Sequence, residues 1–130
     1  MAAKSEKDVL IVDDEDDFLE LAEEIFAGSG YRIGTAHNGR EVRALLKRTF
    51  FRLAIVDYRL PGDNGDAVAD LIHASSPNTS IVFLTGDSSA ARQIRKRFPS
   101  VDACLVKPVA VDELLRIVES LLKRKHTRGG

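Results

Sequence analysis

Four short apolar runs recur along the chain, and a polar residue directly follows each of them. Every run has three or four consecutive apolar positions, so both faces of a strand built from it would be buried. Burial on both faces is typical of strands in a parallel sheet that is covered by helices on both sides. The runs are residues 9–12, 53–56, 81–84 and 104–106.

Segments between these runs have apolar residues at helical spacing and predict five helices. The last helix has a full apolar stripe, which has to pack against the sheet or a partner. A further stretch, residues 31–36, alternates apolar and polar positions and contains Gly34, which favours a strand at the edge of the sheet. The helical apolar positions lie within 18–26, 42–46, 68–72, 90–94 and 111–122.

Capping and turn residues indicate where several of these elements begin. Asn38 followed by Glu41 resembles a capping box at the start of the second helix. Ser88 can cap the fourth helix. The segment 60–65 is dense in turn formers, so we expect a loop there.

Alternating strands and helices of these lengths predict an α/β fold. A flavodoxin-like (βα)5 arrangement fits best, in which a doubly wound five-stranded parallel sheet has the strand order 2-1-3-4-5. Ligands of such sheets bind beyond the carboxyl ends of the strands, where the strand order reverses. The residues at these ends should therefore share one pocket: Asp13, Asp14, Asp57, Thr85 and Lys107.

The composition suits one globular domain. The chain has 130 residues, of which 44% are hydrophobic and 30% charged, enough for one core and too few for two. We assign residues 7–123 to this domain, residues 1–6 to a flexible N-terminus and residues 124–130 to a flexible basic tail. Since we find neither a membrane-spanning apolar run nor the apolar core of a signal peptide, we expect a cytoplasmic protein without membrane contact.

Charge and cysteine content narrow the function classes further. The net charge is −1, and no aromatic or groove-reading element accompanies the basic residues, so we expect no direct nucleic-acid binding. The single cysteine, Cys104, excludes an intramolecular disulfide and a zinc site built from several thiolates.

The ordered set of strand-end residues resembles a known family. The receiver domain of bacterial two-component response regulators has a similar pattern: Asp13-Asp14, then Asp57-Tyr-Arg-Leu-Pro-Gly-Asp-Asn-Gly, then Leu-Thr85-Gly, then Lys107-Pro. The resemblance covers nearly the whole chain and implies the family's roles at the matching positions. Asp57 is then the phosphoacceptor, and Asp13 and Asp14 organise a divalent metal. Thr85 and Lys107 contact the phosphoryl group.

The chemistry of these residue types agrees with that implication. Magnesium prefers oxygen ligands and usually takes one or two carboxylates, and manganese accepts the same ligands. Asp14, Asp57 and the backbone carbonyl of Arg59 are the candidate direct ligands. The family pattern implies that Asp13 acts through a bound water. A cation would keep Asp57 ionised among other carboxylates, so that it can attack a phosphoryl group and form an acyl phosphate.

The resemblance also implies partners. A sensor histidine kinase or a histidine phosphotransfer protein donates the phosphoryl group, and the domain promotes its own phosphorylation and dephosphorylation rather than acting as a conventional enzyme. The fourth helix, fifth strand and last helix form the face for an output domain or protein partner, with a homodimer left open. That face includes Arg92, Arg95 and Cys104. The cognate kinase stays undecided, as does the choice between a stand-alone receiver and part of a longer regulator.

Four positions are expected to modulate the site. Arg59 and Asp87 lie two residues beyond the acceptor and the threonine, and they can pair across the opening of the pocket to affect hydrolysis. Gly86 and Pro108 are the other two positions. The resemblance implies a cis peptide bond before Pro108 that aims the preceding lysine inward.

The switch region departs from the family pattern. Many receivers have an aromatic residue three positions before the lysine, where this chain has Cys104. We interpret Cys104 as a small buried hydrophobe rather than a redox-sensing thiol, because the chain has no resolving cysteine. We still expect phosphorylation to draw Thr85 inward and to shift the helix over 88–97, which has a thin apolar face.

Other functions stay open on the sequence. A magnesium-dependent phosphohydrolase with an aspartate nucleophile has a similar pocket, but it normally has a second acid two residues after the nucleophile, where this chain has Arg59. A phosphate-independent docking module would keep the fold without phosphorylating Asp57, and the intact site set argues against it. A flavin carrier is disfavoured, because the acidic segment 13–17 would repel the flavin phosphate.

Overall fold

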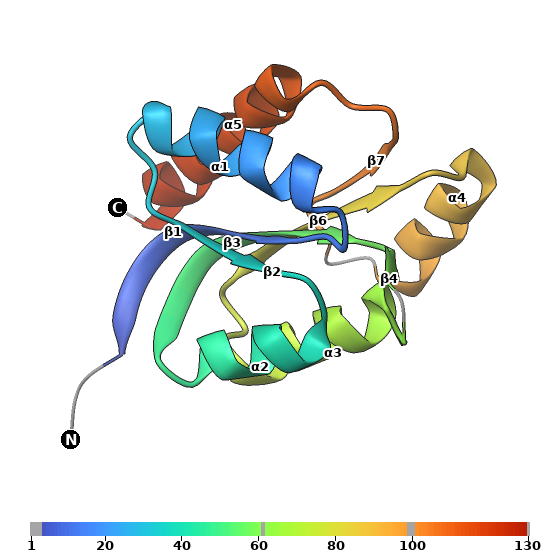
Figure 1. The fold of residues 1–130 in the computed structure, drawn as a ribbon, viewed down its shortest axis with the longest axis horizontal. Helices are drawn as coiled ribbons and strands as arrows, with labels where there is room; N and C mark the ends of the chain where they lie inside the picture. Colours follow the sequence, from blue (N-terminus) through green and yellow to red (C-terminus); the bar gives the residue numbers. More distant parts are fainter. Residues whose placement is uncertain (1–3, 61, 99–100, 130) are drawn as a thin grey trace.

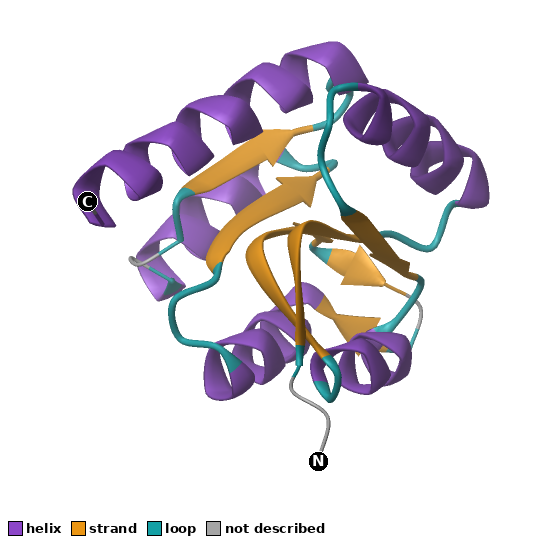
Figure 2. Cartoon of the chain, turned by 90° about the vertical axis from the view of Figure 1, so that its left-hand side faces the viewer, coloured by secondary structure: helices purple, strands orange, loops and turns teal. Residues whose placement is uncertain are grey.

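A five-stranded parallel sheet organises the computed structural model, which describes residues 4–60, 62–98 and 101–129. Helices cover both faces of this sheet (Figure 1, Figure 2). The order β2-β1-β3-β6-β7 equals 2-1-3-4-5 when its strands are counted along the chain, so the predicted flavodoxin-like α/β fold is confirmed. The strands of the sheet are β1 (Ser5–Val12), β2 (Ile33–Ala36), β3 (Thr49–Asp57), β6 (Ser80–Thr85) and β7 (Ala103–Val106), and the helices are α1 (Asp16–Gly28), α2 (Gly39–Leu46), α3 (Gly65–Ser75), α4 (Ser88–Arg97) and α5 (Val111–Gly129).

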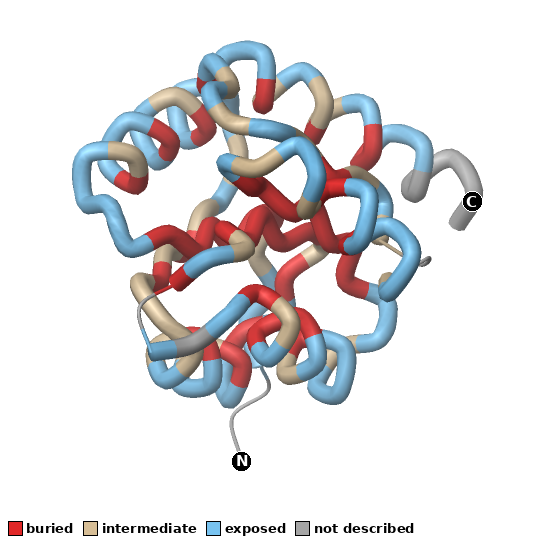
Figure 3. The backbone as a smooth tube through the Cα atoms, turned by 90° about the vertical axis from the view of Figure 1, so that its right-hand side faces the viewer, coloured by how far each residue is buried: buried red, intermediate tan, exposed pale blue. Residues whose placement is uncertain are grey.

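Each face of the sheet has its own apolar core. Successive side chains of a strand point to opposite faces, and in β1 Leu10 and Val12 belong to the core beneath α2, α3 and α4. Val9 and Ile11 belong to the other core, beneath α1 and α5. Figure 1 shows α1 and α5 on one side of the sheet and α2 and α3 on the other. These strands lie in the buried centre of the molecule (Figure 3). Because both of their faces are buried, their sequences are continuous apolar runs.

The alternating stretch forms the edge strand β2, as predicted, although the strand begins at Ile33 rather than Tyr31. Its glycine has a packing reason. A Cβ atom on Gly34 would lie 2.6 Å from Cζ of Phe51, so any larger residue there would have to displace the Phe51 ring from its place against β2.

The segment after β3 contains more regular structure than the sequence predicts. We expected a loop over 60–65, but β4 (Arg59–Leu60) and β5 (Asp63–Asn64) form a short antiparallel pair. Gly62, at φ 76°, supplies the positive φ for the reversal. The Asn64 side chain then accepts a hydrogen bond from the backbone N–H of Ala67 and caps α3.

Two helix caps differ from their predicted form. Asn38 caps α2 as expected, since its side chain accepts a hydrogen bond from the N–H of Glu41. Glu41, however, accepts its reciprocal bond from the N–H of His37, one residue earlier than a capping box requires. The α4 cap is Asp87 rather than Ser88, because Asp87 accepts bonds from the backbone and hydroxyl of Ser89.

The ends of the fold extend past the predicted domain limits. β1 begins at Ser5, so Ser5 and Glu6 of the expected flexible N-terminus pair with Thr49 and Phe50 of β3. α5 runs to Gly129, into the expected tail. Whether either end is flexible stays a prediction. Among the described residues, no helix is both long enough and apolar enough to cross a membrane.

Candidate functional site

The sheet brings the predicted site residues to one edge. Asp13 and Asp14 follow β1, Asp57 is the last residue of β3, Thr85 ends β6, and Lys107 follows β7. Because these strands are parallel and adjacent, their carboxyl ends lie together, and the predicted convergence is confirmed. The residues come from widely separated parts of the chain, so the site exists only in the folded sheet.

Three carboxylates form the centre of this site. Asp13, Asp14 and Asp57 each offer one ligand oxygen, and these oxygens lie within 4.8 Å of one another. Asp13 is fully buried and Asp57 is 7% exposed, whereas Asp14 is exposed to solvent. The set contains hard oxygen donors and neither imidazole nor thiolate, which fits Mg²⁺ or Mn²⁺ better than a softer metal.

Lys107 joins two of these carboxylates. Its Nζ atom lies 3.2 Å from Oδ2 of Asp57 and 3.3 Å from Oδ2 of Asp13. Burial alone would lower the pKa of the Lys107 ammonium, but the two carboxylates outweigh it and raise the pKa above its usual value. The ammonium therefore stays charged in the pocket.

The carboxylate of Asp57 is oriented through both oxygens. Oδ1 accepts a hydrogen bond from the backbone N–H of Arg59 at 3.2 Å, and Oδ2 faces Lys107. Burial raises the pKa of Asp57, and the charge of Asp13 adds to this effect. Lys107 and the Arg59 amide oppose the rise, because both favour the carboxylate form.

Hydrogen bonds with the backbone also fix the position of Asp13. Its Oδ1 atom accepts a hydrogen bond from the N–H of Glu15 at 2.9 Å, and its own N–H donates to the carbonyl of Ala36 at 3.0 Å. One carboxylate oxygen of Asp13 thus holds the turn into α1, while the other faces Lys107.

Thr85 connects the site to α4. It is 1% exposed, and its hydroxyl oxygen accepts a hydrogen bond from the backbone N–H of Asp87 at 3.2 Å. Its carbonyl accepts a bond from the N–H of Lys107 at 2.7 Å. The Lys107–Pro108 peptide bond is cis, as the family resemblance implied.

The predicted pair across the opening of the pocket is not formed. Within the described residues no ion pair joins Arg59 to Asp87, and Oδ1 of Asp87 caps α4 instead. The bonds from Ser89 lower the pKa of Asp87, and Arg59 contributes a smaller electrostatic effect in the same direction.

Gly86 is exposed, and a Cβ atom there would meet nothing within 4 Å.

Cys104 is a buried hydrophobe, as predicted, with 4% of its surface exposed. Burial raises the pKa of its thiol, which disfavours the reactive thiolate. Its carbonyl accepts a hydrogen bond from Nη2 of Arg95 at 3.2 Å, so Arg95 ties α4 to β7.

Sequence reasoning missed one residue beside the site. We placed Phe18 among the core positions of the first helix, but its ring also lies 5.7 Å from Nζ of Lys107. A cation at this distance from an aromatic face is attracted to it. The only sequence signal was its place four residues after Asp14, in the first turn of the helix that follows the acidic segment.

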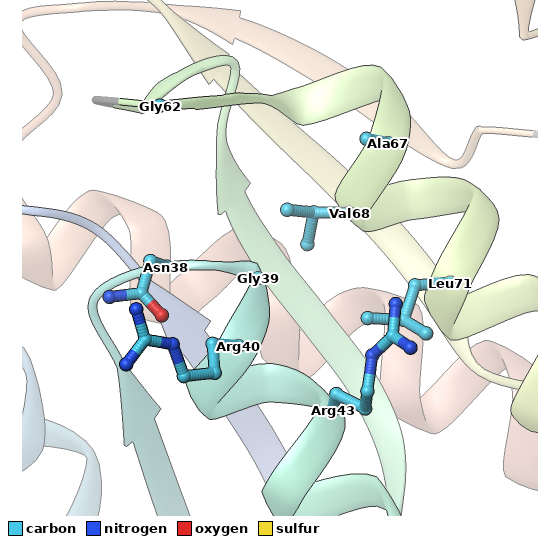
Figure 4. A pocket seen from close by; sticks show the side chains of 8 residues that line it. All are labelled: Asn38, Gly39, Arg40, Arg43, Gly62, Ala67, Val68 and Leu71. Atoms are coloured by element: carbon cyan, nitrogen blue, oxygen red, sulfur yellow. The ribbon is translucent and has the colours of Figure 1, made fainter.

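A separate groove of about 490 Å³ lies between α2 and α3. Figure 4 shows Arg40 and Arg43 along one side and Val68 pointing into it. None of the residues that line it belongs to the acidic site. The groove and the site are therefore distinct features of the molecule.

Comparison with known proteins identifies the family. The family model for the response regulator receiver domain matches residues 9–119, a span that contains all five strand-end residues of the site. The chain therefore belongs to the response regulator receiver domain family.

Curated relatives are longer than this chain. The response regulator protein PilR of Pseudomonas aeruginosa is 31% identical over 122 residues, which cover 94% of this chain and 27% of PilR. The regulatory protein VanRB of Enterococcus faecalis is 29% identical over 116 residues, which cover 89% of this chain and 52% of VanRB. The chain thus spans a quarter to a half of the length of these regulators.

Solved structures have the same fold over nearly their full length. A CheY-like receiver domain protein from Methanospirillum hungatei has a TM-score of 0.84 at 28% identity, covering 95% of this chain and 99% of that chain. The response regulator TrrA from Thermotoga maritima, solved in complex with Mg²⁺-BeF, has a TM-score of 0.73 at 33% identity, covering 88% and 98%.

Proposed function

We propose that this receiver domain is a phosphoacceptor switch that takes a phosphoryl group from a phosphohistidine onto Asp57 in a magnesium-dependent reaction. The observation that carries the proposal is the position of Lys107 between Asp57 and Asp13 in a pocket of three carboxylates. An ordinary surface salt bridge does not require this arrangement, because a single carboxylate is enough to pair with one lysine.

Asp13, Asp14, Asp57 and the backbone carbonyl of Arg59 are the groups that would hold Mg²⁺ or Mn²⁺, with Asp13 acting through a water. The TrrA complex contains Mg²⁺ in the same fold, which supports this assignment. The bound ion would neutralise charge on the carboxylates and on the oxygens of the incoming phosphoryl group. Every other contribution comes from the chain itself.

Asp57 is the nucleophile in this proposal. A carboxylate oxygen attacks phosphorus, a P–O bond forms, and the P–N bond to the donor imidazole breaks with its electron pair leaving on the imidazole nitrogen. The hydrogen bond from Arg59 N–H to Oδ1 holds the carboxylate in one orientation for this attack.

Lys107 and Thr85 stabilise the charge that the transfer brings into the pocket. The ammonium already faces the acceptor oxygen. Thr85, which is buried, is the last residue of the neighbouring strand β6 and supplies a hydroxyl. Water can later attack the acyl phosphate, which releases inorganic phosphate and returns Asp57 to its carboxylate form. In this sense the domain promotes its own phosphorylation and dephosphorylation.

Residues around the pocket would set the lifetime and the output of the phosphorylated form. Arg59, Gly86, Asp87 and Pro108 are the proposed modulating positions. Since Asp87 caps α4, its effect would act through α4 and Thr85 rather than through an ion pair with Arg59. Cys104 fills the aromatic switch position with a smaller side chain.

The donor in this proposal is a sensor histidine kinase or a histidine phosphotransfer protein in the cytoplasm. The output passes through α4, β7 and α5 to a partner or an attached output domain, or to a second copy of the chain. Regulators such as PilR and VanRB, which extend well beyond this chain, support the attached-domain form of this proposal.

Intact mass measurement tests the proposal. Wild type and Asp57→Asn are incubated with acetyl phosphate and Mg²⁺, and then with a phosphorylated histidine kinase. Addition of one phosphoryl group to wild type alone is expected. No addition from either donor to folded, magnesium-bound wild type would favour the phosphate-independent docking module, and steady turnover of a small phosphate ester would favour the phosphohydrolase.

A further inference from the structure

Helix α4 is tied to the acidic site at its N-terminal end. Asp87 caps the helix through Ser89, and the N–H of Asp87 donates to the hydroxyl of Thr85. If the Thr85 hydroxyl turns toward a phosphoryl oxygen, the contact with Asp87 changes with it. The start of α4 would then move with the state of the site.

The C-terminal end of α4 has a different attachment. Nε of Arg97, the last residue of α4, lies 3.3 Å from Oδ2 of Asp66, in the first turn of α3. The Asp66 side chain is only 13% exposed, whereas that of Arg97 is 65% exposed. The Tyr58 hydroxyl faces the same carboxylate, since burial and, after it, a hydrogen bond to Asp66 raise the pKa of Tyr58. Arg97 is the cation that pairs with this largely buried carboxylate, so its loss leaves the charge of Asp66 without that partner.

An aromatic row runs beside this ion pair. Tyr58, directly after the acceptor aspartate, packs edge-on against Phe83, with ring centroids 5.5 Å apart. Phe83 packs against Phe98, directly after α4, with centroids 5.6 Å apart. The guanidinium of Arg97 lies 5.7 Å from the Phe98 ring. The row and the ion pair together join the end of β3 to the end of α4.

Few other contacts hold α4 in place. Ala91 and Ile94 are the buried residues of α4, Ala90 packs against the same core from a partly buried position, and Arg95 donates a hydrogen bond to the Cys104 carbonyl. A helix with so small a buried face is displaced at low cost. The contacts at its two ends therefore have a large share in fixing its position.

We propose that Asp66 and Arg97 form a latch that holds α4 in the position it has in this structure and opposes its displacement by the phosphorylated site. Asp66 is then a positioning residue, which acts through Arg97 and α4 and touches none of the reacting atoms. The proposal has two parts. The holding of α4 is independent of phosphorylation, whereas the opposition to the phosphorylated state rests on the proposed function.

The first part is tested on the unphosphorylated protein. Arg97→Gln and Asp66→Asn should both speed amide hydrogen exchange in α4. Lys96→Gln removes the same charge from the neighbouring exposed position, so its α4 exchange should match wild type. Arg97→Lys should restore part of the protection. Urea unfolding of each variant confirms that it is folded, and unchanged α4 exchange in folded Arg97→Gln would overturn the latch.

The second part is tested by titrating each protein with beryllofluoride in the presence of Mg²⁺. Because the latch opposes the activated position of α4, Arg97→Gln should bind beryllofluoride about 2- to 30-fold more tightly than wild type, with Lys96→Gln unchanged. Equal or weaker binding by Arg97→Gln would overturn this part. If wild type bound no beryllofluoride at all, the proposed function would fail, while the exchange measurement would still decide whether Asp66 and Arg97 hold α4.

Discussion

The ammonium nitrogen of Lys107 lies 3.2 Å from Oδ2 of Asp57, although fifty positions separate the two residues in the chain. The same nitrogen lies 3.3 Å from Asp13, so one cation compensates two buried carboxylates. This relationship makes the site electrostatically dependent on Lys107 in the absence of a metal.

Lys107→Met should destabilise the metal-free protein at neutral pH. The substitution leaves Asp13 and Asp57 without their cation, at a cost of about 1–3 kcal/mol in the free energy of unfolding. Urea unfolding in the presence of EDTA measures this change, and Lys47→Met, at an exposed position of α2's C-terminal end, is the matched control. Equal stability of Lys107→Met and wild type would show that the lysine does not compensate these charges.

Magnesium should stabilise the wild-type fold and should do so less in Asp14→Asn. A ligand that binds only the folded state at one hundred times its Kd adds about 2.7 kcal/mol to the free energy of unfolding. Asp14 is exposed, so its loss should leave the metal-free stability nearly unchanged while it weakens the response to Mg²⁺. Thermal unfolding across a Mg²⁺ titration separates the two effects. An undiminished response in Asp14→Asn would exclude Asp14 as a ligand.

His37 joins two helices near the site through both of its ring nitrogens. Nδ1 lies 2.7 Å from Oε1 of Glu41 in α2, and Nε2 lies 2.6 Å from Oδ1 of Asp16 in α1. Both nitrogens can donate only when the ring is protonated. The bond to Glu41, followed by the bond to Asp16, raises the pKa of His37 above its usual 6.5.

The raised pKa gives a definite pH dependence of stability. A group whose folded pKa is higher than its unfolded pKa stabilises the fold fully below the unfolded value of about 6.5, and that contribution is lost as the pH rises through the folded value. His37→Gln should flatten this part of the stability curve, whereas His73→Gln, at an exposed position, should keep it. An NMR titration of the His37 ring with a midpoint at or below 6.5 would contradict the account.

Two glycines should respond oppositely to alanine. A Cβ atom on Gly65 would lie 2.7 Å from Cα of Tyr58, and backbone at that distance cannot move aside easily. Gly65→Ala should therefore lower the free energy of unfolding by about 1–3 kcal/mol. Gly28→Ala, in α1, meets nothing within 4 Å and should be neutral or stabilising. Chemical unfolding of both variants checks this, and equal effects would contradict the close approach at Gly65.

Much of the fold and the centre of the site follow from local sequence. The continuous apolar runs predict strands buried on both faces, and the parallel sheet then places Asp13, Asp57 and Lys107 at one edge, where the structure has them. The burial of Cys104 also follows, because it lies inside an apolar run. These predictions succeed because periodicity and strand direction fix them without knowledge of side-chain partners.

Contacts between distant elements could not be predicted in the same way. Asp87, rather than Ser88, caps α4, and which of two adjacent capping residues is used depends on how the strand end positions the backbone. The pairing of Asp66 with Arg97 depends on the distance between α3 and α4, which no spacing in the chain encodes. The β4–β5 pair forms inside a turn-rich segment whose composition favours a loop equally well.

Direct location of the phosphoryl group tests the central claim most sharply. The protein is phosphorylated with acetyl phosphate and Mg²⁺ and then reduced with borohydride, which converts an aspartyl phosphate to homoserine, and the modified peptide is sequenced by mass spectrometry. We predict homoserine at position 57 and unmodified aspartate at positions 13 and 14. Homoserine at either of those two positions, or reduction that leaves position 57 as aspartate in protein shown to have been phosphorylated, would contradict the assignment of Asp57 as the acceptor.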